Sequence, residues 1–283
     1  MKVTVTGGMG KLGQWVVRAL LETRDGAAHE VTAFDRASGP EQPGVRALAG
    51  DVEDLGQVCG AVAGADAIIH LAAIARPNVA PDDVTFRTNV MGAYNVHEAA
   101  YLLGVRRVVS ASSQAILGWD YRRRDFPPAY LPVDEDHPVR PQDPYGLSKE
   151  VLEAVARSYA RKGLETVVLR PNWIVTPEDR AQLHRQGGRQ ATGFKMHSYI
   201  DVRDLATAFR LAVERPVEPG TVLFVVADDT TLAEPLSEAL PRLMPAIGDQ
   251  ARHLTGTRAG ISNARAREVL GWQPRPSWRE TAD

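Results

Sequence analysis

Short apolar stretches alternate with amphipathic helical patterns along the first two-thirds of the chain. The apolar stretches have the length of β-strands and cover residues 3–5, 30–34, 67–70, 107–110 and 166–169. The segments between them carry apolar residues three and four positions apart, as at Leu12, Trp15, Val16, Ala19 and Leu20. Strands that alternate with helices indicate βαβ units and a parallel sheet. Because the strands are apolar throughout, we expect both faces of the sheet to be covered, which gives a doubly wound α/β fold.

The alternating pattern weakens after residue 170 and returns near residues 200–226. The polar segment 177–193 has no apolar periodicity and is expected to be a loop. We therefore expect a sheet domain built from residues 1–170 plus about 200–226. A small C-terminal lobe that binds the substrate is expected from residues of about 171–199 and 227–283.

The composition excludes several classes of protein. Lys and Arg number 33 and Asp and Glu number 35, so the net charge of −2 lacks the basic excess of a nucleic-acid-binding protein. No apolar run is long enough to span a bilayer, and the first residues do not form a signal peptide. The single cysteine, Cys59, cannot form an intramolecular disulfide, and the histidines lack the spacing of metal ligands. We expect a cytoplasmic protein that binds no metal, nucleic acid or membrane.

Three glycines follow the first expected strand and open the first expected helix. Gly7, Gly10 and Gly13 have the spacing G-x-x-G-x-x-G. Such glycines permit a tight turn, let the backbone approach a pyrophosphate and let helix and strand pack closely, while the helix N-terminus attracts phosphate. A turn without a ligand is the alternative, but the strand–turn–helix context favours a Rossmann-type dinucleotide site. The residues of this turn expected to contact the cofactor are Gly7, Met9, Gly10, Lys11 and Leu12.

Acidic residues after the second and third expected strands indicate the type of dinucleotide. Asp35 lies about 20 residues past the glycine turn, where a carboxylate accepts hydrogen bonds from ribose hydroxyls and repels a 2′-phosphate. This favours NAD over NADP, although Arg36 next to it has the opposite tendency. Asp51 and Val52 follow the third strand, where the carboxylate is suited to the adenine amino group. The alternative roles are a turn residue for Asp35 and a helix N-cap for Asp51.

Tyr145 and Lys149 are four residues apart at the start of an expected helix, so they share one face of it. A cation beside a phenol lowers the pKa of the tyrosine, which makes Tyr145 a candidate general acid or base near neutral pH. Ser113 follows an expected strand at the carboxyl edge of the sheet, where ligands bind in such folds. Its hydroxyl is placed to hydrogen-bond the same substrate oxygen. An unrelated surface pair of Tyr and Lys is the alternative, which the glycine turn and the serine disfavour.

Seven motifs occur in the order found in one enzyme superfamily. They are residues 6–13 (T-G-x-x-G-x-x-G), 70–73 (H-x-A-A), 89–92 (N-x-x-G), 112–118 (S-S-x-x-V-Y-G), 145–149 (Y-x-x-x-K), 169–172 (a strand end beside the nicotinamide) and 199–204 (Y-I-x-V-x-D). Through these motifs, which span about residues 1–226, the chain resembles the extended short-chain dehydrogenase/reductase superfamily, of the NAD-dependent epimerase/dehydratase type. It departs from the fourth motif at Leu117, where the family has tyrosine.

The resemblance implies an NAD cofactor and hydride transfer between the nicotinamide and a substrate carbon. It implies that Tyr145 is the acid/base, that Lys149 binds the nicotinamide ribose and lowers the pKa of Tyr145, and that Ser113 hydrogen-bonds the reacting oxygen. The further cofactor contacts that it implies are Leu71, Ala72, Ala73, Asn89, Tyr145, Lys149 and Pro171. Related proteins pair through the helices that carry Asn89 and Tyr145, so a homodimer is implied as well.

Within the family, the residues favour a dehydrogenase of a free sugar or uronate. Gln114 and Ala115 follow Ser113 where a dehydratase has an acidic pair, and the chain after Val226 is short for a lobe that holds a sugar nucleotide. Segments around His70 and Ser113 look most like the uronate dehydrogenase branch. The alternative is a UDP-sugar epimerase with tightly bound NAD.

The substrate is expected to be a small sugar-like molecule. Its expected contacts are Ser113, Gln114, Tyr145, Asn172 and Trp173. Residues 122–124, which are all arginine, and one of Arg185 and Arg189 are candidates for binding an anionic group of the substrate. The alternative for these arginines is plain surface charge.

Overall fold

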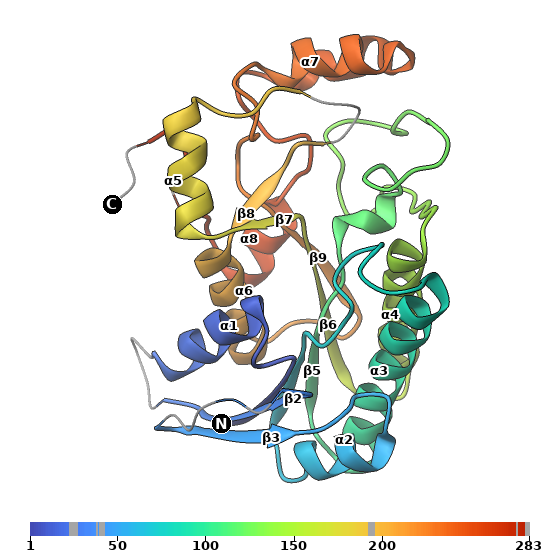
Figure 1. The fold of residues 1–283 in the computed structure, drawn as a ribbon, viewed down its shortest axis with the longest axis vertical. Helices are drawn as coiled ribbons and strands as arrows, with labels where there is room; N and C mark the ends of the chain where they lie inside the picture. The colour runs from blue at the N-terminus through green and yellow to red at the C-terminus, as the bar shows by residue number, and fades with distance from the viewer. Residues whose placement is uncertain (23–27, 38, 40–42, 192–195, 276, 281–283) are drawn as a thin grey trace.

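A seven-stranded parallel sheet forms the centre of the computed structural model, which describes residues 1–22, 28–37, 39, 43–191, 196–275 and 277–280 (Figure 1). In spatial order the strands are β3 (Val45–Ala49), β2 (Glu30–Asp35), β1 (Lys2–Thr6), β4 (Ala67–His70), β5 (Arg107–Ala111), β6 (Glu165–Pro171) and β9 (Thr221–Val225). The strand order reverses between β1 and β4. The crevice beyond the carboxyl ends of these two strands is therefore the switch point at which open α/β sheets bind ligands.

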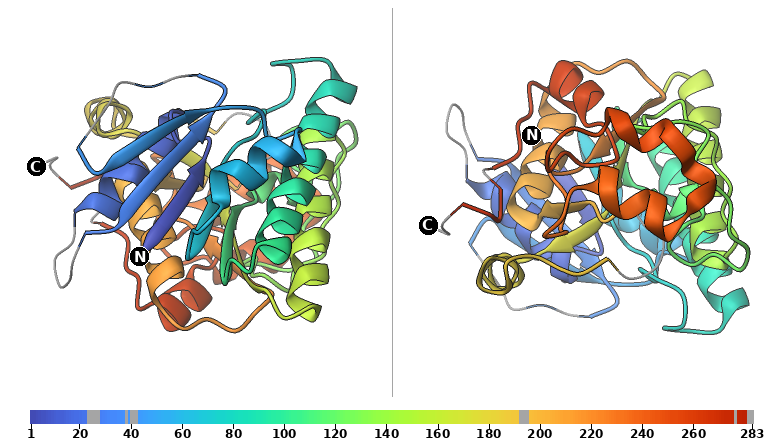
Figure 2. Two further views of the ribbon diagram at one scale, coloured as in Figure 1. Left: turned by 90° about the horizontal axis from the view of Figure 1, so that it is seen from below. Right: turned by 90° about the horizontal axis from the view of Figure 1, so that it is seen from above.

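Helices cover both faces of this sheet (Figure 2). One face carries α1 (Lys11–Leu21), α6 (Val202–Glu214) and α8 (Ala264–Leu270), and the other carries α2 (Leu55–Val62), α3 (Asp82–Leu102) and α4 (Pro144–Arg161). Strand side chains alternate between the two sides, so that Ile69 packs in the cluster of α1 and α6 and Ile68 packs in the cluster of α2 and α3. The strands are apolar throughout because both of their faces are buried. The expected doubly wound Rossmann-type fold is confirmed.

A third hydrophobic cluster lies near the carboxyl end of β9 and includes Phe224 and Val226. It joins η1 (Gln114–Leu117), α7 (Leu236–Leu243) and η2 (Pro245–His253) to Trp119 and Leu131 of the long connection before α4. A short parallel pair, β7 (Trp173–Val175) and β8 (Tyr199–Asp201), stands beside it. Part of the range expected for the small lobe packs elsewhere, because Leu270 and Trp272 of the α8 region belong to the core of the main sheet.

The expectation of a loop over residues 177–193 is wrong for most of that segment. Residues Pro177–Gln186 form α5, while residues 192 and 193 lie outside the described residues. Thr176 and Asp179 form a capping box at its start, and Gly187 ends it with a left-handed φ of 65°. These caps satisfy the free backbone groups of the helix ends, so α5 forms without a regular apolar stripe.

None of the described helices is long and apolar enough to cross a membrane.

Candidate active site

The glycine turn lies at the carboxyl end of β1, against the start of α1 and the segment after β4. Gly7 has a φ of 72°, and a Cβ on it would lie 2.7 Å from the amide nitrogen of Ala72. A Cβ on Gly13 would overlap the carbonyl oxygen of Gly7. Both positions therefore need glycine for the turn to close onto helix and strand.

The N-terminus of α1 opens directly from this turn. Gly10 is the N-cap and brings no side chain to the free amides of Lys11 and Leu12, the first helical residues. Unpaired amides at a helix start, together with the positive end of the helix dipole, suit a pyrophosphate. The turn therefore fits a dinucleotide, and its residues are the ones named from the sequence.

Asp35, at the end of β2, is fixed beside the turn. Its Oδ2 accepts a hydrogen bond of 3.1 Å from the amide of Met9, while the neighbouring Arg36 is exposed. Asp51 accepts a hydrogen bond of 2.9 Å from the amide of Glu53, and the N-cap of α2 is Asp54 instead. The predicted contacts of Asp35 with ribose and of Asp51 with adenine remain predictions.

Asn89 holds the segment that follows β4. This α3 residue is buried, and its Oδ1 accepts a hydrogen bond of 2.8 Å from the amide of Ile74. Its Nδ2 donates to the carbonyl of Ile74 and to Oγ of Ser148 on α4. These hydrogen bonds tie Ile74, which follows the predicted contacts Leu71, Ala72 and Ala73, to α3 and α4, and a contact of Asn89 with the cofactor stays a prediction. Val52 is also buried, against Gly92 of α3.

The start of α4 brings Tyr145 and Lys149 to the end of β5. Asp143 caps the helix by accepting a hydrogen bond of 2.9 Å from the amide of Gly146. A Cβ on Gly146 would lie 2.8 Å from the carbonyl oxygen of Ala115, so glycine lets the helix start approach the segment that carries Ser113. Tyr145 and Lys149 are both buried, and Lys149 Nζ lies 5.7 Å from the ring centre of Tyr145. The predicted trio is therefore brought together.

Burial sets the protonation of both residues on α4. It raises the pKa of Tyr145 to about 12, against the opposing effect of a hydrogen bond from Ser113. It also lowers the pKa of Lys149 to about 8. Lys149 Nζ donates a hydrogen bond of 2.8 Å to the carbonyl of Ala111, and the expected lowering of the pKa of Tyr145 by Lys149 stays a prediction.

Glu153 and Arg170 form a buried ion pair that supports the segments carrying Ser113, Tyr145 and Lys149. Glu153, one turn after Lys149, accepts hydrogen bonds of 2.8 Å from Nε and Nη2 of Arg170 and from Oγ of Ser112. Arg170 precedes Pro171 at the end of β6, and Ser112 precedes Ser113. One carboxylate thus links the three segments that carry the candidate site.

A cavity of about 440 Å³ opens in front of Ser113 and Tyr145. The predicted contacts Pro171, Asn172 and Trp173 line it. The lining residues that the sequence did not reveal are Ala75, Arg76, Ala115, Asp120, Tyr121, Ile174, His197, Ser198 and Thr231. Ala115 belongs to η1 and Ile174 to β7, while the others come from connecting segments whose course no local spacing encodes.

Gln114 is not among the lining residues. Its side chain is buried, and its Nε2 donates a hydrogen bond to the carboxylate of Asp120. Asp120 and Tyr121 line the cavity at this point instead. Gln114 therefore supports the wall of the cavity from behind, and a direct contact with substrate stays a prediction.

Two arginines give the cavity a positive edge. The guanidinium of Arg189 lies 4.7 Å from the ring centre of Trp173, and Arg76 lines the cavity as well. Among residues 122–124, Arg122 pairs with Asp125, and none of the three lines the cavity. The anion-binding role considered for Arg189 is thus compatible with its position.

Within the described ranges, no group of three or more His, Cys, Asp or Glu side chains is arranged to hold a metal ion.

The switch-point crevice, the glycine turn and the Ser–Tyr–Lys cluster define a Rossmann-type oxidoreductase of the extended short-chain dehydrogenase/reductase class. Residues 3–227 match the NAD dependent epimerase/dehydratase family, and the chain belongs to this family. The family uses NAD, which confirms the expected cofactor.

Two relatives and one solved structure illustrate the similarity. L-arabinose 1-dehydrogenase (NAD(P)(+)) of Haloferax volcanii is 30% identical over 90% of this chain and 98% of its own length. Uronate dehydrogenase of Pseudomonas syringae pv. tomato is 28% identical over 82% of this chain and 76% of its own, which confirms the likeness to that branch. A short-chain dehydrogenase/reductase superfamily protein from Agrobacterium tumefaciens, solved with bound NAD, matches 99% of this chain and 94% of its own with a TM-score of 0.72 and 26% identity.

Proposed function

We propose that this protein is an NAD-dependent dehydrogenase of a free sugar or uronate, with Ser113, Tyr145 and Lys149 as its catalytic residues. The observation that carries the proposal is that Ser113 and Tyr145 line the same cavity, with Lys149 next to the ring of Tyr145. The names of the two relatives support the substrate class.

Each residue has a distinct role in oxidising a hydroxyl to a carbonyl. When bound, NAD supplies the hydride acceptor. Tyr145 takes the proton of the substrate hydroxyl, and Ser113 hydrogen-bonds the same oxygen and holds it in place. Lys149, as a cation behind the phenol, favours the phenolate and binds the ribose. Since burial raises the pKa of Tyr145 to about 12, the phenol is neutral at pH 7, and oxidation is expected to accelerate as the pH rises.

The remaining wall suits a polyhydroxylated substrate. Asp120, Asn172, Ser198 and Thr231 offer acceptors and donors to hydroxyl groups. The edge formed by Arg76 and Arg189 suits a carboxylate, since guanidinium groups bind carboxylates through paired hydrogen bonds. A uronate would use both parts of this wall, and a neutral aldose only the first.

The family description also includes epimerases, and one assay separates the two reactions. Purified protein is mixed with NAD or NADP and with L-arabinose, glucuronate or UDP-glucose, and absorbance of the reduced nicotinamide is followed. A dehydrogenase produces net reduced cofactor with a free sugar or uronate. An epimerase regenerates NAD in each cycle, so conversion of UDP-glucose without net reduction would contradict the proposal.

A further inference from the structure

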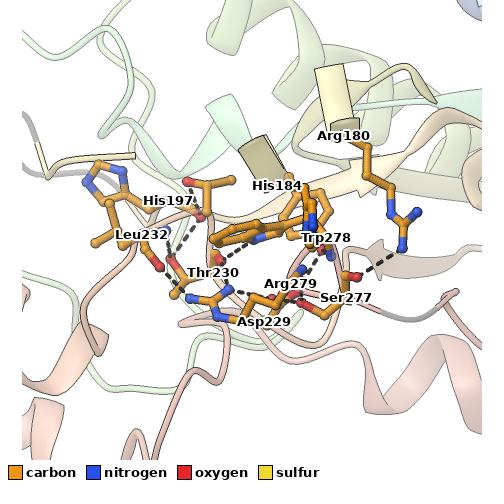
Figure 3. Close-up of polar contacts among 11 residues, drawn as sticks. Arg180, His184, His197, Asp229, Thr230, Leu232, Ser277, Trp278 and Arg279 are labelled. Carbon is orange, nitrogen blue, oxygen red and sulfur yellow. Dashed lines mark hydrogen bonds and ion pairs between the residues drawn. The ribbon is translucent and has the colours of Figure 1, made fainter. Parts of the chain in front are cut away.

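Residues 277–279, which we call the clasp, form a short segment that lies beside residues 229–232 (Figure 3). It is far in sequence from the glycine turn and the catalytic helix. The clasp makes polar contacts to α5, to β8 and to residues 229–232. Each of these stretches contains or adjoins a residue that lines the cavity. Arg189 follows α5, Ser198 precedes β8, and Thr231 belongs to residues 229–232.

Asp229 anchors the clasp in a buried position. Its carboxylate accepts hydrogen bonds from the hydroxyl of Tyr199 at 2.8 Å, from Oγ of Ser277, and from Nη1 of Arg279 at 2.8 Å. Burial raises the pKa of Asp229, and these three donors lower it. A buried carboxylate with a cationic partner is strongly position-specific, because loss of the partner leaves an uncompensated charge.

Arg279 also binds the backbone on both sides of Thr231. It donates from Nη1 to the carbonyl of Thr230 at 3.1 Å and from Nη2 to the carbonyl of Leu232. Trp278 adds a hydrogen bond of 2.9 Å from Nε1 to the same carbonyl of Thr230. Thr231 lines the cavity, so its backbone is held from behind at two flanking residues.

Thr231 in turn holds two other residues of the cavity wall. Its amide donates to the carbonyl of His197 at 2.8 Å, and its carbonyl accepts from the amide of Arg189 at 2.8 Å. His197 has a φ of 47°, a strained conformation for a residue other than glycine. Such strain persists only where the surroundings over-determine it. Gly188 next to Arg189 packs on Trp278, since a Cβ there would lie 2.7 Å from the indole ring.

We propose that the clasp sets the substrate side of the cavity and that Arg279 is a positioning residue for substrate recognition. Arg189, His197 and Thr231 form one hydrogen-bonded wall whose outer side Arg279 and Trp278 fix. The part of this proposal that concerns substrate rests on the proposed dehydrogenase function. The part that concerns the wall does not, because it follows from contacts within the chain.

Arg275 supplies a matched control on the same segment. Its Nε lies 3.1 Å from Oδ1 of Asp204, which is also buried, but Asp204 belongs to α6 and does not line the cavity. Arg279→Gln and Arg275→Gln therefore each remove one guanidinium from one buried aspartate. Arg279→Lys keeps a charge near Asp229 but cannot reach two carbonyls as a planar fork does, and it covers the case in which Arg279→Gln folds poorly.

The first measurement is hydrogen exchange followed by mass spectrometry on the full chain. In Arg279→Gln, peptides that cover residues 196–201 and 229–233 should exchange about tenfold faster, whereas a β5 peptide should not change. Arg279→Lys should lie between wild type and Arg279→Gln. Arg275→Gln should leave both wall peptides at the wild-type rate. The proposal would be overturned if the wall peptides exchanged at the wild-type rate in Arg279→Gln, or if their exchange rose equally in Arg275→Gln.

The second measurement is steady-state kinetics with the free sugar or uronate that the wild type oxidises. Arg279→Gln should raise the KM for this substrate about tenfold, with kcat and the Kd for NAD within about twofold of wild type. A fall in kcat at unchanged KM would overturn the positioning role. If the wild type oxidises no sugar, the proposed function fails, and the exchange rates alone decide whether the clasp fixes the wall.

Discussion

Burial of Tyr145 and Lys149 on one face of α4 is the residue-scale feature with the largest consequence for chemistry. The spacing of the two residues is visible in the sequence, and so is the glycine turn. The direction of the pKa shift of Tyr145 is not visible, because it depends on how deeply the folded chain buries the phenol. Asp120 and Arg76 could not be predicted for a similar reason, since loop paths bring them to the cavity.

Lys149→Met is expected to abolish turnover and to stabilise the fold at neutral pH. The pKa of Lys149 is about 8 in the folded protein and 10.5 in its ordinary state. Below pH 8 the lysine is charged in both states, so burying the charge lowers the free energy of unfolding by its full amount. This cost disappears as the pH rises toward 10.5. After allowance for the hydrogen bond to Ala111, we expect a gain of about 2 kcal/mol in the free energy of unfolding at neutral pH.

Urea denaturation of wild type and variant at pH 7 and pH 10 measures this effect. The gain should shrink at the higher pH, and Lys162→Met, which removes an exposed lysine at the end of α4, should show little change at either pH. A variant less stable than wild type at neutral pH would show that burial of Lys149 carries no such cost.

Asp35→Asn is expected to relax the preference for NAD. Asparagine can still accept the hydrogen bond from the amide of Met9, so the turn is retained while the charge is lost. Without repulsion of the 2′-phosphate, and with Arg36 beside it, kcat/KM for NADP should rise about tenfold. Initial rates with both cofactors test this expectation. An unchanged ratio would place the ribose away from Asp35.

At the scale of elements, α5 shows where pattern reading fails. Its apolar residues have no regular stripe, so periodicity predicted a loop, yet the capping box of Thr176 and Asp179 was present in the sequence. The strands, in contrast, were predictable because a sheet covered on both faces leaves a continuous apolar signature. The close approach of α4 to η1 could not be predicted from any local pattern, since it depends on a tertiary contact at Gly146.

Gly146→Ala is expected to push α4 away from η1. The added Cβ would lie 2.8 Å from the carbonyl oxygen of Ala115, so we expect a loss of about 1–3 kcal/mol in the free energy of unfolding and a fall in kcat. Gly60→Ala is the control, because a Cβ on this α2 residue would meet no described atom within 4 Å. It should stabilise the protein by about 0.5–1 kcal/mol and leave kcat unchanged. Thermal unfolding and kinetics of both variants separate the effect of the close contact at Gly146 from the general effect of replacing a helical glycine by alanine.

At the scale of the whole molecule, the outer side of the α3–α4 pair carries exposed apolar side chains. Met91, Tyr94 and Leu102 on α3 and Leu147 on α4 are each more than a third exposed. Tyr94 packs edge-on against Tyr159 of α4, which places it where the two helices meet. Such a surface is suited to a two-fold contact between four helices.

The expected homodimer can be tested by light scattering coupled to size exclusion. The wild-type mass should be twice the 30.8 kDa of one chain. Tyr94→Glu should halve it, because a charge at the centre of an apolar contact is costly to bury. A wild-type mass equal to that of one chain would show that the protein is a monomer and that this face is not a dimer interface.

The central claim, that Tyr145 handles the proton in an NAD-dependent sugar oxidation, is tested most directly by Tyr145→Phe. The change removes one hydroxyl and keeps the ring. With the substrate found for the wild type, formation of reduced nicotinamide should fall by about 10²–10⁴-fold. The Kd for NAD should change far less than this rate, because the other expected cofactor contacts are kept. Turnover at the wild-type rate in Tyr145→Phe would contradict the account.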